Sequence, residues 1–390
     1  MKLFRKIIVL STTLLLTIPS LAVENPAAQQ AYQQAAELYQ SDAERGDPKA
    51  QYMLATLYRT GQGVDQNLAE AAKWYAKAAE QNYADAAVKI AWMYYQGEGV
   101  KQDFAKAADW YRKVSMEQGA AEIEYNLGLM YYQGSGVTQD FVAAAEWFGR
   151  AADRGFADAQ YNLGLMHYKG QGVTHDYAAA VFWYQKAATQ GKVEALNNLG
   201  SCYYYGQGVT KDVSQSLVLY TKAAEQGLSD AQYNVGLLYA KGEGIAQEVN
   251  TAVSWYQKAA GQGHSNAQYN LALLYYKGEG VSRDLNQAAH WYGLAANSGH
   301  INAQYNLALM YYKGEGVAKN LVEAFELYDK AAAQQHGNAQ YNLGWLYYKG
   351  EGVKQDFAEA QAWFTKAAKN NIADAQYMIG KMYDEGTATD

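Results

Sequence analysis

Apolar and small residues recur at one fixed spacing along almost the whole chain of 390 residues. The phrase Ala-Gln-Tyr-Asn-Leu-Gly at 159–164 returns with at most one change at 231–236, 267–272, 303–308 and 339–344. Its leading position, alanine except for Ile123, recurs every 36 residues from Ala50 to Ala375, apart from one step of 37 residues. A period of this length is typical of a solenoid of stacked units, which usually offers a long binding surface instead of one catalytic pocket.

The unit around residue 267 shows how each repeat is expected to fold. Asn266 is a suitable N-cap for a helix over 267–277, because its side chain can accept backbone N–H bonds. Gly278 ends that helix, since glycine enters the left-handed conformation without steric cost. Asp284 caps a second helix over 285–296. The same order of N-cap residues and helix-ending glycines recurs along the chain. Each unit is therefore predicted to be a helical hairpin, and the fold class to be all-α.

The first helix of each hairpin has two distinct faces. On a helical wheel, Ala267, Leu271 and Tyr275 share one side, which is expected to face the partner helix and form the core. Tyr269 and Tyr276 point almost directly away from that side, and an asparagine and a lysine lie on the adjoining stripe. The second face is therefore the candidate binding surface.

Tyrosine, asparagine and lysine recur on that second face in long columns. The first tyrosine column is Tyr125, Tyr161, Tyr233, Tyr269, Tyr305 and Tyr341. The second tyrosine column is Tyr132, Tyr168, Tyr204, Tyr276, Tyr312 and Tyr348. The asparagine column is Asn126, Asn162, Asn198, Asn234, Asn270, Asn306 and Asn342, and the lysine column is Lys169, Lys241, Lys277, Lys313 and Lys349. Tyrosine combines a large apolar ring with a hydroxyl that can form hydrogen bonds, which favours partner binding. Stacking of the tyrosines between repeats stays open as the alternative.

Tryptophan occupies one position on the second helix, at Trp74, Trp110, Trp147, Trp183, Trp255, Trp291 and Trp363, with leucine at 219 and 327. Interchange with leucine is what packing tolerates, so these residues are interpreted as core. On that interpretation Trp255→Ala costs about 3–5 kcal/mol of stability by cavity formation.

The complete pattern is that of a known family. Ala-x-x-x-Leu-Gly-x-x-Tyr-x-x-Gly-x-Gly-Val-x-x-Asp, followed by Ala-x-x-Trp-Tyr-x-Lys-Ala-Ala, resembles the SEL-like repeat (SLR) family, relatives of the tetratricopeptide repeats. The resemblance implies a right-handed α/α solenoid in which the second face lines a concave groove. It also implies assembly of protein complexes, envelope or cell-surface signalling, or host interaction. The predicted segments are a capping half-repeat over 23–49, about nine repeats over 50–374 and a half-repeat over 375–390.

The first 22 residues have the three parts of a secretory signal peptide. Lys2, Arg5 and Lys6 precede an apolar run over 7–18, and small residues lead to a cleavage site after Ala22. The run is short for a membrane span, although an uncleaved anchor remains the alternative. Export to the periplasm or the extracellular space is expected, with no membrane span after cleavage.

Charge and cysteine content exclude other classes of protein. The net charge of −7 and the lack of a basic arm argue against nucleic-acid binding. Cys202 is the only cysteine, so no intramolecular disulfide forms, and the residue is interpreted as core packing.

The short stretch after Tyr383 predicts a last helix without a second helix behind it, which makes self-association through that end a hypothesis.

No catalytic or metal constellation emerges from the sequence. Some cysteine-rich exported relatives in the SLR family are linked to β-lactam binding or hydrolysis, but no serine here has a lysine three residues later. His264, His300 and His336 recur at the turns between units, about 8–10 Å apart on stacked layers, which is too far for one shared zinc ion. They are interpreted as turn residues.

The sequence therefore predicts a non-enzymatic scaffold without cofactor or metal that binds a protein or an extended peptide, acidic peptides included, through the tyrosine, asparagine and lysine columns. Asparagine would bond to peptide backbone groups, and lysine would favour acidic groups. Recognition of a glycan such as peptidoglycan is the alternative, and a β-lactamase-like hydrolase is the least favoured reading.

Overall fold

The computed structural model describes residues 26–118 and 121–388, and the proposed signal peptide over 1–22 lies outside these residues. Every regular element in the described residues is an α-helix. The helices are α1 (Pro26–Glu44), α2 (Pro48–Thr60), α3 (Leu68–Glu80), α4 (Ala84–Gln96), α5 (Phe104–Gln118), α6 (Ala121–Gln133), α7 (Phe141–Asp153), α8 (Ala157–Lys169), α9 (Tyr177–Thr189), α10 (Val193–Tyr205), α11 (Val213–Glu225), α12 (Ser229–Lys241), α13 (Val249–Gly261), α14 (Ser265–Lys277), α15 (Leu285–Asn297), α16 (Ile301–Lys313), α17 (Leu321–Ala333), α18 (Gly337–Lys349), α19 (Phe357–Lys369) and α20 (Ala373–Asp384). The prediction of an all-α repeat protein is confirmed.

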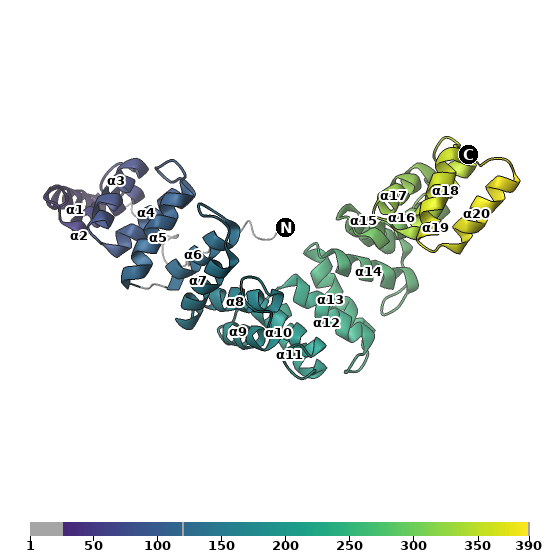
Figure 1. Cartoon of the computed structure of the whole chain (residues 1–390), viewed down its shortest axis with the longest axis horizontal. Helices are drawn as coiled ribbons and strands as arrows, with labels where there is room; N and C mark the ends of the chain where they lie inside the picture. The colour runs from purple at the N-terminus through teal and green to yellow at the C-terminus, as the bar shows by residue number, and fades with distance from the viewer. Residues whose placement is uncertain (1–25, 119–120, 389–390) are drawn as a thin grey trace. The chain divides into compact units, whose positions relative to one another are not determined.

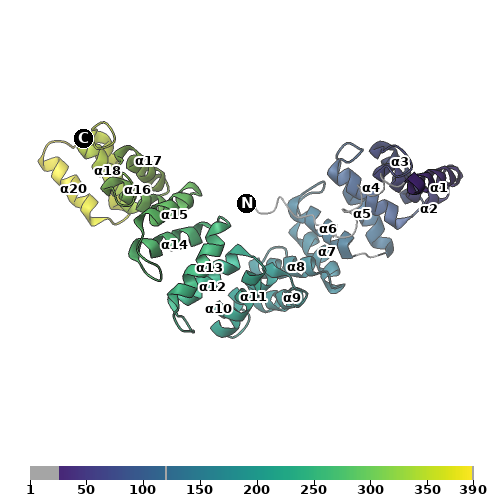
Figure 2. The same ribbon diagram turned by 180° about the vertical axis from the view of Figure 1, so that it is seen from behind.

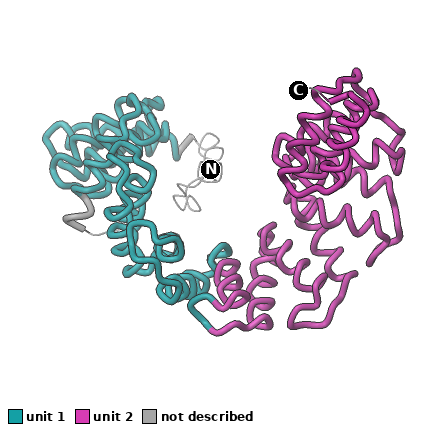
Figure 3. The backbone as a smooth tube through the Cα atoms, turned by 45° about the vertical axis from the view of Figure 1, so that its right-hand side comes forward, with its two compact units in different colours: residues 1–195, 207–209 teal, residues 196–206, 210–390 magenta. Residues whose placement is uncertain are grey.

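The chain divides into two compact units (Figure 3), one of residues 1–195 with 207–209 and one of residues 196–206 with 210–390. Within each unit, the extensive contacts join helices that are consecutive in the chain, as Figures 1 and 2 let the reader follow. This nearest-neighbour packing is the defining property of a solenoid. From α2 onward, even-numbered helices are the first and odd-numbered helices the second of each hairpin.

Glycine shapes the turn inside each hairpin for two different reasons. Gly278 is the C-cap of α14 with φ +76°, and its N–H donates to the carbonyl of Leu274. Gly316, the second glycine of the next such turn, lies against α15, where an added Cβ would approach the carbonyl oxygen of Leu285 within 2.3 Å. The first glycine thus provides the left-handed backbone, and the second also lets two repeats approach closely.

The turn between hairpins has the same left-handed backbone even where glycine is missing. Asn82, Gln335 and Asn371 stand at the usual glycine position and have φ of 64°, 65° and 61°. Asparagine tolerates this region better than most residues, whereas glutamine is strained there. The repeat geometry therefore overrides the local preference of the residue.

The expected helix caps are confirmed for the second helices and need a correction for the first. Asp284 accepts hydrogen bonds from the backbone N–H groups of Asn286 and Gln287 at 2.9 and 3.0 Å. Asn266, however, lies inside α14, and the N-cap is His264, whose Nδ1 accepts from the N–H of Ala267 at 3.2 Å. The helix begins earlier than expected because histidine, an unusual cap, presents a ring nitrogen in place of an oxygen.

The residues of α14 that the helical wheel assigned to the core are buried, with one exception. Ala267, Leu271 and Ala272 are fully buried, and Leu274 is buried with them. Tyr275 is only partly buried, and its hydroxyl accepts a hydrogen bond from Gln257 at 3.4 Å. The hydroxyl therefore lies at the edge of the hairpin, not in the dry interior. None of the helices in the described residues is long and apolar enough to cross a bilayer.

Candidate functional site

The first tyrosine column lies at the joints between repeats. Tyr269 stacks on the imidazole of His300, with 4.5 Å between ring centroids and 17° between ring planes. It also tilts against Tyr292 at 5.8 Å. Tyr233 and Tyr305 have the equivalent pairs of neighbours in their own repeats. These rings are partly buried, so they contribute to packing and keep some area for contact.

The second tyrosine column connects each repeat to the turn of the next. The hydroxyl of Tyr276 donates to Glu315 Oε2 at 2.9 Å, and that of Tyr312 donates to Glu351 Oε2 at 3.0 Å. The other members of the column do the same: Tyr132, Tyr168, Tyr204 and Tyr348 donate to Gln171, Gln207, Glu243 and Glu385. The hydrogen bond to Glu315, followed by burial, raises the pKa of Tyr276. These hydroxyls are already engaged inside the fold.

The asparagine column bonds mainly to side chains of neighbouring helices. Asn306 Nδ2 donates to the hydroxyl of Tyr292 at 3.2 Å, and Asn234 Nδ2 donates to Asn197 Oδ1 at 3.0 Å. Asn270 and Asn342 form side-chain hydrogen bonds with the tyrosine hydroxyls around them. At the N-terminal end of the columns Tyr125 and Asn126 are only 5% and 6% exposed, which leaves them almost no contact surface.

The lysine column is the exposed edge of this surface. The side chains of Lys169, Lys277, Lys313 and Lys349 all reach solvent. Lys277 Nζ pairs with Glu279 at 3.7 Å, and Lys349 Nζ lies 5.2 Å from the centroid of the Trp345 ring. Among the described residues Lys313 has no ion-pair partner, and the same holds for Lys169, Lys241 and Lys349. Lys313 therefore presents an unpaired ammonium group.

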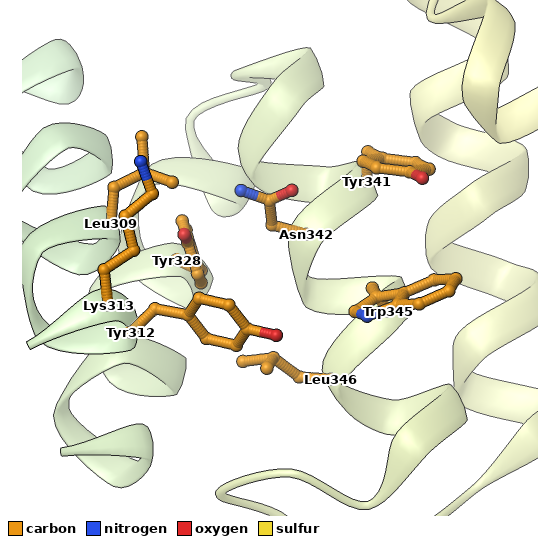
Figure 4. A pocket seen from close by; sticks show the side chains of 8 residues that line it. All are labelled: Leu309, Tyr312, Lys313, Tyr328, Tyr341, Asn342, Trp345 and Leu346. Carbon is orange, nitrogen blue, oxygen red and sulfur yellow. The ribbon is translucent and has the colours of Figure 1, made fainter. Parts of the chain in front are cut away.

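Members of all three kinds of column meet in one pocket of the C-terminal unit (Figure 4). Its volume is about 240 Å³, comparable to one large apolar side chain, and it opens between α16 and α18 with α17 behind. The lining residues are Leu309, Tyr312, Lys313, Tyr328, Tyr341, Asn342, Trp345 and Leu346. The sequence predicted Tyr312, Lys313, Tyr341 and Asn342 as binding residues. Sequence reasoning did not single out Trp345. The signal that could have identified it is that the three preceding repeats have leucine at the same position, at Leu237, Leu273 and Leu309.

An equivalent pocket in the N-terminal unit is almost closed. It is lined by Leu129, Tyr132, Phe148, Asn162, Leu165 and Met166, each 180 residues before its counterpart, and its volume is about 10 Å³. Trp345 replaces Leu165, and its ring stacks on Tyr348 with 5.8 Å between centroids and 25° between planes. Because the backbone repeat is the same, the difference between the pockets comes from a few side chains.

The pocket combines apolar walls, neutral hydroxyls and one cation. Burial raises the pKa of Tyr328 and Tyr312, and in Tyr312 the hydrogen-bonded Glu351 raises it further. Burial, followed by the charge of Asp374, also raises the pKa of Tyr341. All three phenols therefore stay protonated at neutral pH. Such a site can hold an apolar side chain, and Lys313 offers a cation at the side of the pocket, while Glu351 and Asp374 bring negative charge close to Tyr312 and Tyr341.

A row of buried glutamines between the repeats was missed by the sequence analysis. Each glutamine donates through Nε2 to a carbonyl oxygen of the preceding second helix, as Gln304 does to Ala296 at 3.2 Å. In every member of the row except Gln268, Oε1 accepts from the residue 30 positions later, as from Gln334 at 2.9 Å. The row comprises Gln51, Gln160, Gln232, Gln268, Gln304 and Gln340. Only the 36-residue spacing of these glutamines could have signalled the pattern.

The tryptophans require a correction. Trp74 is 8% exposed, but the other described tryptophans of this column are only partly buried. One face of the indole commonly lies under a cation three residues later: Lys258 Nζ is 3.9 Å from the Trp255 ring centroid, and Lys366 Nζ is 3.6 Å from that of Trp363. Cation–π contacts explain why a large ring is stable at a half-exposed position.

Metal ligands and the cysteine thiol are the two kinds of reactive group that the structure allows to be checked. No three His, Cys, Asp or Glu side chains lie close enough there to hold a metal ion. Cys202 is fully buried, which confirms its packing role, and burial raises the pKa of its thiol to about 11. The thiolate, which is the reactive form, is therefore scarce at neutral pH.

Comparison with known proteins agrees with this architecture. The Sel1 repeat model matches residues 48–83, 84–116, 121–156, 157–192, 193–228, 229–264, 265–300, 301–336, 337–372 and 373–390. The chain therefore belongs to the Sel1 repeat family, as the resemblance indicated. Sel1 repeat proteins are generally protein-interaction scaffolds and are typically not enzymes. A comparison with curated proteins found no match.

Two solved structures illustrate the relationship. A Sel1 repeat protein from Oxalobacter formigenes is 31% identical, with 80% of this chain and 89% of that chain covered and a TM-score of 0.69. A protective antigen present in uropathogenic Escherichia coli strains, with an SLR fold, is 36% identical, with 91% of this chain and 84% of that chain covered and a TM-score of 0.49.

Proposed function

We propose that this chain is a scaffold that binds an extended segment of a partner protein across the first helices of its C-terminal unit. The observation that carries the proposal is the pocket between α16 and α18, where Tyr312, Lys313, Tyr341 and Asn342 meet. Apolar pockets with a few converging polar groups are the usual place for an anchor residue of a partner. The general role of Sel1 repeat proteins as interaction scaffolds supports the same conclusion.

The chemistry of the pocket defines the segment that fits. An aliphatic or aromatic side chain fills the space between Leu309 and Trp345. A carboxylate beside it pairs with Lys313, which has no ion-pair partner among the described residues. An exposed ion pair contributes only about 0–1 kcal/mol, so the apolar anchor supplies most of the affinity and the lysine supplies selectivity.

The experiment is a selection of peptides from a random library on the purified chain, followed by affinity measurement by fluorescence anisotropy. Trp345→Leu introduces the residue of the nearly closed N-terminal pocket, so it is compatible with the fold and weakens binding. Lys313→Ala weakens binding of peptides with an acidic residue and removes most of its salt dependence. Lys354→Ala, an exposed lysine outside the pocket lining, is the matched control.

The outcomes separate the two classes of ligand. Peptides that bind the wild type and the Lys354→Ala variant, but bind Trp345→Leu weakly, support the proposal. Equal binding to all variants, or binding of oligosaccharides and no peptides, contradicts it, and the oligosaccharide result establishes glycan recognition.

The proposal includes an exported location, which is supported by the charged, apolar and small-residue segments over 1–22. N-terminal sequencing of the protein from fractionated cells tests this. A mature chain that starts at Val23 in the periplasm or medium is the expected result, and an intact Met1 on cytoplasmic protein contradicts it.

A further inference from the structure

The last helix, α20, has the sequence of a first helix, but its partner-facing side is uncovered. Tyr377 is 70% exposed, although it continues the column of the partly buried Tyr341. Gln376 is exposed as well, whereas its counterpart Gln340 is 4% exposed. No described helix occupies the second-helix position beside α20.

A glycine on α20 marks the position of the missing neighbour. In the preceding repeat, an added Cβ at Gly344 would lie 2.9 Å from Cδ1 of Phe364 on the second helix. At Gly236 the same close approach is made by Tyr256, at 2.8 Å. This position holds only alanine or glycine throughout the repeats, because an aromatic ring presses on it. An added Cβ at Gly380, by contrast, would have no atom of another element within 4 Å.

The first helix of the described residues, α1, lacks the opposite partner: a first helix beside it. Its sequence is that of a second helix, with Leu38 and Tyr39 one period before Trp74 and Tyr75. Tyr75 is 1% exposed and Trp74 is 8% exposed, since both pack within a complete hairpin. Leu38 is 69% exposed and Tyr39 is only partly buried. Thus α1 has an apolar face and no described first helix to cover it.

The two uncovered faces are halves of one recurring contact. In complete hairpins the tyrosine of the first helix packs on the aromatic ring of the second, with centroid separations of 5.7 Å for Tyr341 and Phe364 and 5.9 Å for Tyr305 and Tyr328. Tyr377 is the first-helix member of this pair, and Tyr39 is the second-helix member. One chain carries both, at opposite ends of its repeats.

We propose that α1 of one copy of the chain docks on α20 of a second copy, as the second helix of an intermolecular hairpin. Tyr39 then packs on Tyr377 and lies over Gly380, and Leu38 is covered as Trp74 is within its own repeat. The contact repeats an arrangement that most complete hairpins of the chain form; Val88 and Asn197 replace the tyrosine in the other two. The proposal does not depend on the pocket or its ligand.

This joint is heterologous, because two different surfaces meet. Each joined pair retains one free α1 and one free α20, so association either continues along a chain of copies or closes into a ring. The weight-average mass is therefore expected to rise with concentration beyond that of a single copy.

Sedimentation velocity and light scattering over a concentration series test the proposal on the whole chain. Gly380→Leu fills the position of the Tyr39 ring and meets nothing within its own copy, so it leaves the fold intact. We expect it to lower the association constant at least about tenfold, as overpacking of a close contact does. Gly149→Leu makes the same change on α7, where a Cβ also meets nothing within 4 Å, and is the matched control. Tyr39→Ala tests the opposite side of the joint.

Loss of association in both Gly380→Leu and Tyr39→Ala, with Gly149→Leu unchanged, supports the proposal. Mixing the two defective variants then restores pairs only, since each retains one intact surface. A chain that remains a single copy at all concentrations overturns the proposal. Association that is lost in Gly380→Leu but unaffected in Tyr39→Ala also overturns it, because a different surface then covers α20.

Discussion

The row of buried glutamines contains one gap that makes a sharp prediction about stability. Gln268 Nε2 donates to the carbonyl of Ala260 at 3.1 Å, but its buried Oε1 accepts no hydrogen bond from a described residue. In the neighbouring repeats the donor is Gln262 for Gln232 and Gln334 for Gln304. At the corresponding position this repeat has Ser298, whose hydroxyl bonds instead to the carbonyl of Leu294.

Ser298→Gln supplies the missing donor and should stabilise the α14–α15 region. A net hydrogen bond contributes about 0.5–1.5 kcal/mol, and the lost rotamer freedom of the new glutamine offsets part of that, so we expect a gain of about 1 kcal/mol. The reverse change, Gln262→Ser, leaves Gln232 Oε1 buried without its donor and should cost about 1–3 kcal/mol.

Urea unfolding followed by circular dichroism measures the overall effect, and hydrogen exchange in α14 and α15 localises it. The local measurement matters because the stability of a solenoid is a sum over repeats and their interfaces. Ser298→Met, which has a similar length but no donor, is the control and should give no such gain. Equal protection in Ser298→Gln and Ser298→Met would show that the pairing of side chains does not explain the stability of this row.

Three further outcomes follow from burial and protonation. Trp255→Ala should lower the free energy of unfolding by about 1–3 kcal/mol and Tyr256→Ala by about 3–5 kcal/mol, because Trp255 is only partly buried whereas Tyr256 is buried. Unfolding curves that reverse this order would contradict the packing described above. Burial lowers the pKa of His300 and His336, so the unfolded chain binds more protons as pH falls below about 6.5. The free energy of unfolding should therefore decrease in that range, and should decrease less after both histidines are changed to Asn, as measured by urea titration at several pH values. Native Cys202 should not react with a thiol reagent at neutral pH but should react in urea; fast labelling of the folded chain would refute its burial.

The repeat architecture could be predicted because its signals are local. Gly278 as a C-cap and Asp284 as an N-cap depend on a few consecutive residues, the 36-residue period can be counted along the chain, and the structure confirms all three. The cap at the start of the first helix was misplaced by two residues, since a histidine imidazole in this role is uncommon and Asn266 offered a more usual cap.

The candidate site was only partly visible in the sequence. Helical spacing placed Tyr312 and Asn342 on the same face, and both line the pocket. The sequence alone did not show that the hydroxyl of Tyr312 bonds to Glu351, because these residues are 39 positions apart and meet only when repeats stack.

What the sequence by itself determined is the all-α hairpin repeat and the residues that recur on each face, because glycine turns and helix caps are local signals and the 36-residue period can be read directly along the chain. Only the tertiary structure decided which of those faces are open. The Trp345 pocket of about 240 Å³ and its nearly closed counterpart depend on side chains from two repeats, and the space beside Gly380 is empty because no described second helix lies there. Near-identical sequences can therefore form unequal surfaces, since the volume between helices is set by the neighbouring side chains and not by the repeat itself.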